Sequence, residues 1–249
     1  MPDKLVTRGL VLRATETKEA DYILNVLTAE HGRLAVIARG ARRRSSKLAA
    51  ACQHLAFSEL VLYRRGSWYY LDEASTIALF DGLRADLEKL SLASYFAEMA
   101  EAVTSEDLPS GEVLSLLLNS LYALDTLDRP NELVRAAFEL RLLALSGYEP
   151  LLDDCAMCGR ADPVEPVFDA AQGVVLCKKC AGPAGGLLLD AGALAAMRHI
   201  VGAPSKRLLS FTLEPASLAR LSAACESFAT VQLDRRFRTL DFYKSIRST

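Results

Sequence analysis

The segment Asp21–Arg39, DYILNVLTAEHGRLAVIAR, contains two apolar runs, at 21–28 and 33–39, that are joined by a short polar link ending in Gly32. Glycine suits a turn that needs a positive φ, so the segment predicts a β-hairpin. Three more runs of this kind lie at 4–13, 55–64 and 68–75. About five short strands favour a small closed barrel of the oligonucleotide-binding (OB) type, because closure removes exposed strand edges.

From Asp81 onward the apolar residues recur at three- and four-residue spacing, which indicates helices. Helices are predicted from 81 to about 103 and at about 110–127, 130–146, 189–202 and 215–233, and Gly147 is suited to follow the end of the third. The predicted fold class is α+β, with an N-terminal five-stranded OB-like β-barrel over residues 1–80. An α-helical domain follows over residues 81–249 and carries an inserted cysteine module at about 150–187.

The composition is that of a globular chain, with 51% hydrophobic and 24% charged residues among 249. No apolar run approaches the roughly 18 residues of a membrane span, and the N-terminus MPDKLVTRG lacks the apolar segment of a secretion signal. We therefore expect a cytoplasmic protein without a membrane partner. In such a reducing compartment, clustered cysteines bind metal more often than they form disulfides.

Four of the six cysteines form two matched pairs, Cys155-Ala-Met-Cys158 and Cys177-Lys-Lys-Cys180, with 18 residues between them. Four thiolates at this spacing can close a tetrahedron around Zn²⁺. Because four protein ligands leave no open position, structural zinc, one ion per chain, is favoured over catalytic zinc. Two redox dithiols are the alternative. The single Cys52 and Cys225 lie in apolar surroundings and are predicted to be inert core thiols.

Charge is divided unevenly along the chain. Residues 1–80 carry 12 lysines and arginines against 8 acids, a net +4, whereas the remainder carries 17 against 23, a net −6. The densest positive stretch is IARGARRRSSK, residues 37–47, with five cations and no acid. In a mobile loop these cations suit contact with phosphates and carry no base information. The alternative is a solvated loop without a ligand.

The predicted DNA-binding residues are the cations of the basic stretch, four others in the barrel and two at the second cysteine pair: Arg39, Arg42, Arg43, Arg44, Lys47; Arg8, Arg33, Arg64, Arg65; Lys178, Lys179. Five aromatic residues are candidates for stacking on bases: Tyr22, Tyr63, Trp68, Tyr69 and Tyr70. Strand alternation places Trp68 and Tyr70 on one face and Tyr69 on the other, and since at least one face must be core, most of these aromatics are expected to be packing residues.

No pattern for catalysis is found. The sequence has neither a phosphate-binding Gly-x-x-x-x-Gly-Lys loop nor a His-Glu-x-x-His segment. Asp153 and Asp154 leave a metal-dependent nuclease as the least favoured alternative. We therefore predict that the chain is not an enzyme.

Three segments together resemble the bacterial recombination mediator family RecO: GRLAVIARGARR in the barrel, FELRLLALSGYEPLLDDCAMC at 138–158, and ESFATVQLDRRFRTLDFY, which is similar to that family's closing helix. The likeness extends over essentially the full chain. One departure is Ala171-Gln172-Gly173, where the family often has paired glycines, and this puts the local turn in question.

The resemblance implies a non-enzymatic, nucleoid-associated DNA-repair factor that binds single- and double-stranded DNA and anneals complementary strands. It also implies that the partner RecR joins it in loading RecA onto coated DNA, and that it binds the C-terminal tail of the single-strand-binding protein. The alternative function is a zinc-ribbon adaptor that acts through protein contacts, with incidental DNA affinity.

Overall fold

The computed structural model describes residues 4–182 and 185–247. Contacts group the chain into two compact units, of which the second, Asp128–Arg236, is inserted between two parts of the first. The first unit holds the barrel, the helices up to Leu127 and the C-terminal segment from Phe237. The predicted division into domains at residue 80 stays a prediction.

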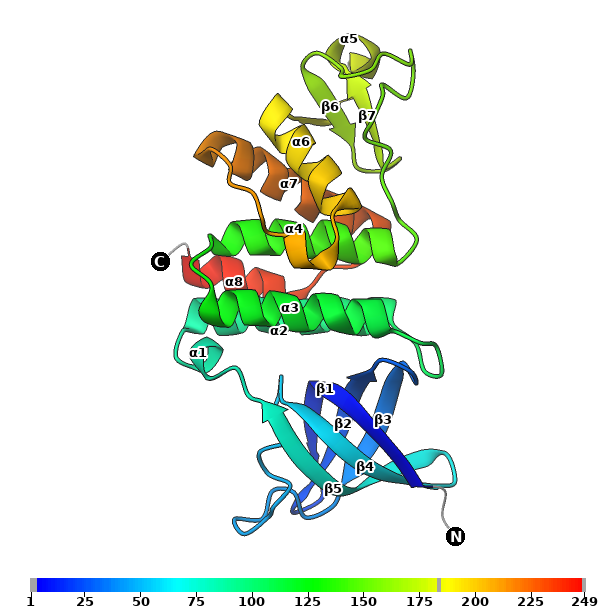
Figure 1. The fold of residues 1–249 in the computed structure, drawn as a ribbon, viewed down its shortest axis with the longest axis vertical. Coiled ribbons are helices and arrows are strands. Elements are labelled where there is room, and N and C mark those ends of the chain that lie inside the picture. The colour runs from blue at the N-terminus through cyan, green and yellow to red at the C-terminus, as the bar shows by residue number, and fades with distance from the viewer. Residues whose placement is uncertain (1–3, 183–184, 248–249) are drawn as a thin grey trace. The chain divides into compact units, whose positions relative to one another are not determined.

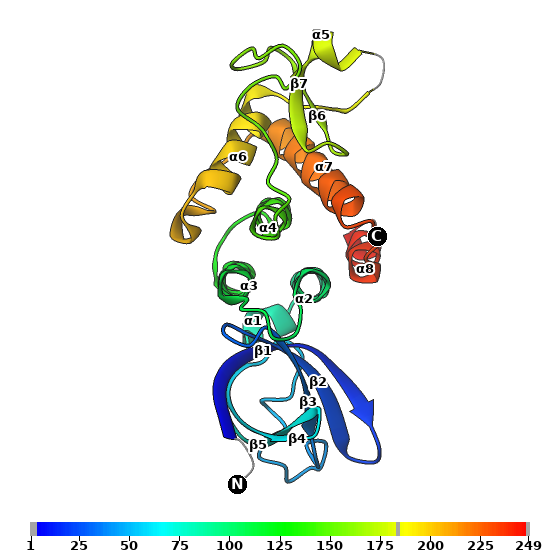
Figure 2. The same cartoon turned by 90° about the vertical axis from the view of Figure 1, so that its right-hand side faces the viewer.

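The N-terminal strands form a closed barrel in the order β1-β2-β3-β5-β4, as Figures 1 and 2 show. The strands are β1 (Lys4–Thr17), β2 (Asp21–Thr28), β3 (Arg33–Ala38), β4 (Phe57–Arg65) and β5 (Trp68–Ala78). The predicted fold class, a five-stranded barrel followed by helices with a cysteine module, is confirmed.

Strand β1 is longer than predicted because it serves two neighbours. Its first part, Lys4–Leu10, pairs with β4, and its second part, Gly9–Thr17, pairs with β2, with a register shift between Val11 and Arg13. Such a bulge bends a strand and lets it continue around a barrel. Parallel pairing of β3 with β5 closes the circle, with Val36 opposite Tyr69.

Alternate residues of each strand fill the barrel. Leu24, Val26, Val36 and Leu62 have no exposed surface, and this apolar interior accounts for the period-two pattern of the sequence. Cys52 is fully buried among them, and burial raises the pKa of its thiol to about 12. Its predicted place in the core is confirmed.

The turn between β2 and β3 depends on Gly32, which has the positive φ, 61°, that the sequence predicts. A Cβ at Gly32 would lie 2.3 Å from the Ser105 carbonyl oxygen and 2.5 Å from that of Leu108, both on the loop after α2. We expect Gly32→Ala to destabilise the first unit by about 3 kcal/mol or more, because backbone cannot move aside easily. Chemical denaturation measures this.

Gly66→Ala is the matched control for that substitution. Gly66 has φ of 66° but nothing within 4 Å of the added Cβ, so only the cost of the backbone conformation, about 1–2 kcal/mol, is expected. Equal losses of stability for Gly32→Ala and Gly66→Ala would show that the close approach of Gly32 to the loop after α2 has no effect on stability.

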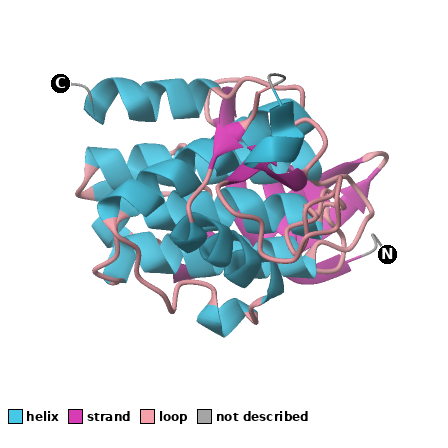
Figure 3. Ribbon diagram, turned by 90° about the horizontal axis from the view of Figure 1, so that it is seen from above, coloured by secondary structure: helices cyan, strands magenta, loops and turns pink. Residues whose placement is uncertain are grey.

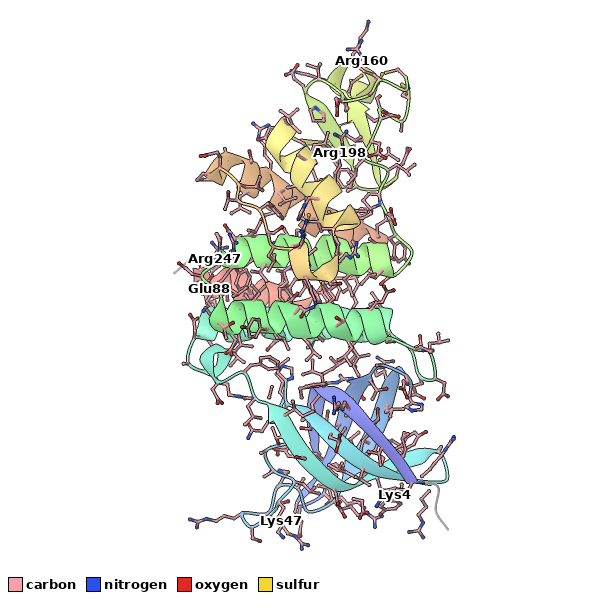
Figure 4. All side chains as sticks on the ribbon, in the orientation of Figure 1. Lys4, Lys47, Glu88, Arg160, Arg198 and Arg247 are labelled. Carbon is pink, nitrogen blue, oxygen red and sulfur yellow. The ribbon has the colours of Figure 1, made fainter. Side chains whose placement is uncertain are left out.

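Four helices complete the first unit: α1 (Asp81–Arg84), α2 (Leu87–Val103), α3 (Gly111–Thr126) and α8 (Arg238–Arg247). Helix α8 packs along α2, where Glu98 accepts hydrogen bonds from the Thr239 amide at 3.2 Å and from its hydroxyl at 2.5 Å. At the other end of α8, Arg247 pairs with Glu88 at 3.4 Å (Figure 4).

The segment that resembles the family's closing helix, residues 226–243, is not one continuous helix in the structure, so this expectation is wrong. Helix α7 ends at Gln232, and Asp234 has a φ of 43°, which no α-helix continues. The polar residues 234–236 offer no apolar side chain to hold a continuous helix, whereas Phe237 is 2% exposed and anchors the start of α8.

The second unit consists of helices and a small sheet; Figure 3 shows how far helices predominate outside the barrel. Its elements are α4 (Asn131–Leu145), β6 (Pro166–Asp169), β7 (Val174–Cys177), α5 (Lys178–Ala181), β8 (Leu187–Leu188), α6 (Ala191–Gly202), the 3-10 helix η2 (Ser205–Arg207) and α7 (Pro215–Gln232). Helix α4 packs against α6 and α7.

Gly147 ends α4 as predicted. Its φ is 91°, its amide donates to the Ala144 carbonyl at 3.2 Å, and the Tyr148 amide donates to the Leu143 carbonyl at 2.9 Å. These bonds satisfy carbonyls at the end of the helix. In the described residues, no helix is both long and apolar enough to cross a membrane.

Candidate metal centre and nucleic-acid interface

Each cysteine pair lies in a tight backbone turn. In the first, the Gly159 amide donates to the Cys155 carbonyl at 2.8 Å, and Gly159 has φ of 68°. In the second, Cys177 ends β7 and the short helix α5 carries Cys180. The two turns are tied together, because the Cys177 amide donates to the Cys155 sulfur at 3.3 Å.

The four sulfurs gather in one place. All lie within 4.8 Å of one another, and those of Cys158 and Cys177 are 3.9 Å apart. A tetrahedral Zn²⁺ with bonds of ~2.3 Å needs sulfurs ~3.8 Å apart, so the spacing fits. Within the described ranges this is the only group of three or more cysteine, histidine or acidic residues that can hold a metal ion, and Asp153 and Asp154 lie outside it.

The thiols of the cluster differ in how readily they ionise. Burial opposes ionisation of Cys155, but backbone amides, first that of Cys177, donate to its sulfur and lower its pKa to about 6. Hydrogen bonds with the sulfurs of Cys177 and Cys158 raise the pKa of Cys180 to about 12. Four neighbouring thiolates therefore need a cation among them, and the cluster can hold a metal ion.

The turn at 171–173 is well formed despite the departure from paired glycines. The Asp169 carboxylate accepts hydrogen bonds from the amides of Ala171 and Gln172, at 2.9 and 3.1 Å. Gly173, with φ of 66°, supplies the one left-handed position and donates to the Asp169 carbonyl at 2.8 Å. The aspartate side chain thus takes the place of a second glycine in shaping the turn between β6 and β7.

Arg198 of α6 holds the cysteine module in place, a role that the sequence did not indicate. Its guanidinium donates to the carbonyls of Leu152 and Asp153, at 2.9 and 2.7 Å, and pairs with Asp162 at 2.7 Å. Figure 4 shows it between α6 and the module. These groups lie on both sides of the first cysteine pair, so one planar fork fixes the position of that turn.

We expect Arg198→Lys to loosen the module, because an ammonium cannot reproduce three bonds in one plane. The expected loss is about 2 kcal/mol of stability in the second unit, with faster metal release to a chelator. Arg220→Lys is the control, since Arg220 makes only a half-exposed ion pair with Asp190 at 3.5 Å. Equal release rates for the two variants would contradict this role.

The basic stretch lies in a segment of turns against the barrel, and its mobility stays a prediction. Residues 39–56 form successive turns, and Ala41, Ala51 and Cys52 are 1% exposed or less against the barrel core. Asp21 accepts a hydrogen bond from the Gly40 amide at 2.7 Å. The buried alanines account for this, because they pack against the barrel while the cations of the segment stay exposed. Lys47 extends from the barrel end that lies away from α2 and α3 (Figures 1 and 4).

The predicted cations fall into two groups. Four have acidic partners: Arg8 with Glu59 (3.6 Å), Arg33 with Glu101 (3.7 Å), Arg42 with Glu16 (2.6 Å) and Lys178 with Glu165 (2.7 Å). Seven make no ion pair with a described carboxylate: Arg39, Arg43, Arg44, Lys47, Arg64, Arg65 and Lys179. Six of these seven belong to the barrel. Most of the predicted DNA-binding cations of the barrel therefore have no ion pair with a described carboxylate.

The aromatic candidates also divide. Tyr22 and Tyr69 pack against the barrel core, and Trp68, 40% exposed, lies at the outer surface. Tyr63 and Tyr70 stack on each other with ring centroids 5.3 Å apart. The predicted opposite orientation of Tyr69 and Tyr70 is confirmed.

The barrel, the helical unit and the four-cysteine cluster together define an OB-barrel protein with an appended module that can hold a metal ion. Family models agree: "Recombination protein O N terminal" matches residues 1–80 and "Recombination protein O C terminal" matches residues 84–241. The chain belongs to the RecO family.

Curated relatives named DNA repair protein RecO match over nearly their whole length. The protein of Acetivibrio thermocellus is 34% identical over 244 residues, 97% of each chain. That of Anaeromyxobacter sp. strain K is 35% identical over 248 residues, which cover 98% of this chain and 97% of the relative. That of Symbiobacterium thermophilum is 31% identical over 96% of each.

Proposed function

We propose that this protein is a non-enzymatic recombination mediator in DNA repair, which binds single- and double-stranded DNA and anneals complementary strands. The observation that carries the proposal is the group of unpaired cations at one end of a closed OB-like barrel. Annealing brings two polyanions together, and lysine and arginine lower the repulsion by displacing counterions without any covalent step.

The uncompensated cations of the barrel are the proposed phosphate contacts, led by Arg43, Arg44 and Lys47, with Arg39, Arg64 and Arg65 extending the surface. Arg8, Arg33, Arg42 and Lys178 contribute less, because each must leave or share an acidic partner. Lys179 lies beside the metal centre and provides a separate contact.

The proposed metal is one structural Zn²⁺ per chain, held by Cys155, Cys158, Cys177 and Cys180. Four sulfurs suit zinc, which prefers tetrahedral thiolate ligands. When bound, the ion adds its binding energy to the folding of the module. With four protein ligands it offers no coordination position to a substrate.

Membership of the family supports two protein partners: RecR, and the C-terminal tail of the single-strand-binding protein. With RecR, the protein would help load RecA onto coated single strands, in the cytoplasm at the nucleoid. These roles rest on the family, whose curated relatives carry the name DNA repair protein.

The alternative is a zinc-ribbon adaptor with incidental DNA affinity. A pocket of about 720 Å³ between the module, α6 and α7 favours it, since Val164 and Leu188 are exposed at its wall. An adaptor would bind proteins there and show little dependence of function on the barrel cations.

The annealing of two complementary oligonucleotides separates these functions. The mediator should accelerate annealing of bare strands and, with RecR, of strands coated by single-strand-binding protein. Acceleration should fall as salt rises. A protein that neither anneals strands nor binds them in a salt-dependent manner would support the adaptor.

A further inference from the structure

The four cysteines of the cluster differ in their access to solvent. Cys155 and Cys177 are buried, Cys180 is half-buried and Cys158 is exposed. Cys158 lies in the turn 156–160, every residue of which is exposed, whereas Cys155 and Cys177 lie against each other, with the Cys177 amide donating to the Cys155 sulfur at 3.3 Å. A reagent dissolved in water therefore reaches Cys158 first.

An open cleft of about 660 Å³ leads to the cluster. Three of the four cysteines line it, Cys158, Cys177 and Cys180, together with Met157 and Val164. Met157 is 69% exposed and Val164 is 66% exposed, so neither side chain covers the cysteines. A molecule as small as a peroxide can therefore reach the cluster from this side without any movement of the backbone.

Cys177 is placed to form a disulfide with Cys158. Their sulfur atoms are 3.9 Å apart and a disulfide bond is ~2.05 Å long, so the two sulfurs need to approach by only about 2 Å. Residues 156–160 are exposed, so no packed side chain of the turn that carries Cys158 opposes this approach. Cys155 is a poorer partner, because it is buried and its sulfur already accepts the hydrogen bond from the Cys177 amide.

We infer that Cys158 is a site of reversible oxidation by peroxides, with Cys177 completing the reaction. The Cys158 thiolate attacks one oxygen of hydrogen peroxide, the O–O bond breaks, hydroxide leaves and a sulfenic acid forms. The Cys177 thiolate then attacks that sulfur, the S–O bond breaks, a second hydroxide leaves and the disulfide forms. The two thiolates lose two electrons in all, and these reduce one peroxide to two hydroxide ions. This inference rests on the proposed zinc, since a bound ion holds cysteines as thiolates.

The oxidation replaces one cross-link of the module with another. After it, only Cys155 and Cys180 remain as thiolates, and two ligands do not hold zinc as four do. The disulfide still joins the first turn to the second, so the module keeps a link between residues 158 and 177 while the ion is lost. A thiol reductant restores both cysteines, because a disulfide, unlike a sulfinic acid, is readily reversible. Zinc retention in the module therefore depends on the oxidants around it.

Two buried cysteines outside the cluster serve as internal references. Cys52 and Cys225 have no exposed surface, and burial raises the pKa of each thiol, so few of these sulfurs are thiolates. Access and ionisation both protect them from a peroxide in solution. We therefore expect Cys52 and Cys225 to stay reduced at peroxide concentrations that oxidise Cys158 completely.

The test treats the zinc-loaded full chain with hydrogen peroxide after its zinc content has been measured. A metal-sensitive dye follows zinc release, and mass spectrometry after alkylation identifies the state of each cysteine. We expect about one zinc ion to be released for each Cys158–Cys177 disulfide formed, and dithiothreitol with added zinc should restore the starting state. Zinc release without a disulfide, or a first disulfide that lacks Cys158 or Cys177, would overturn the inference.

Met157→Leu is the matched control, because Met157 is the other exposed sulfur at the cleft and is itself open to oxidation. Leucine has nearly the same volume, so the rate of zinc release by peroxide should change by less than about 2-fold. A larger fall in that rate would make the methionine the sensitive group and overturn the inference, as would a cluster that keeps its zinc while Met157 is oxidised. A parent chain without zinc at the start refutes the proposed metal as well, whereas DNA binding and annealing are measured separately.

Discussion

Cys158→Ala is expected to abolish stoichiometric zinc binding and to unfold the cysteine module. Cys158 is exposed, so the alanine removes almost no packing, and the effect isolates the lost metal ligand. Structural zinc contributes about 10–16 kcal/mol of apparent binding energy in small zinc domains, and that energy supports folding. We expect a loss of several kcal/mol in the second unit, with zinc content falling from about one equivalent to near zero. Metal analysis and chemical denaturation measure the two quantities.

Cys52→Ala is the matched control, because it also removes one thiol but lies in the barrel core. This variant should keep one zinc ion. A parent protein that folds normally with no metal and four reactive thiols would refute the metal assignment. Annealing by the Cys158 variant should decline only as far as its folding does.

The triple variant Arg43→Ala/Arg44→Ala/Lys47→Ala is expected to lower the slope of log affinity against log salt by up to about 2. Each phosphate contact with a single strand contributes roughly 0.7 to that slope. The loss should be similar for unrelated sequences, because phosphates carry no base information. The barrel should remain folded, since the alanines of this segment, and not its cations, pack against the core. Circular dichroism checks that point.

Lys206→Ala/Arg207→Ala serves as the control, because both side chains are exposed in the second unit. Its slope should match that of the parent. A folded triple variant with the affinity and slope of the parent would show that the DNA surface lies elsewhere on the barrel. Arg42 is left unchanged in this design, since its ion pair with Glu16 gives it a structural part.

The barrel and the cysteine cluster could be predicted because their patterns are periodic or paired. Alternation along residues 21–39 defines two strands, and the cysteine spacing defines four ligands that the fold brings within 4.8 Å. The strands β6, β7 and β8 were missed, because runs of four or two residues are too short to show a period.

Roles that depend on distant residues were also missed. Nothing near Arg198 in the sequence indicates that its partners are Leu152, Asp153 and Asp162, since only the fold brings them together. Likewise, charge density marked the stretch 37–47 but did not separate Arg42, which has an acidic partner, from Arg43 and Arg44. The Tyr63–Tyr70 stack depends on strand register, which composition does not specify.

The packing of α8 on α2 has a consequence for synthesis. Thr239 and Glu98, which join these helices, are 141 residues apart in the chain, and the whole second unit is made between them. Because proteins are synthesised from the N-terminus, α2 leaves the ribosome long before α8 exists. The second unit can therefore fold while the first still lacks its last helix. The face of α2 that α8 covers stays open until α8 has been made, so the nascent chain can misassemble there throughout the synthesis of the second unit.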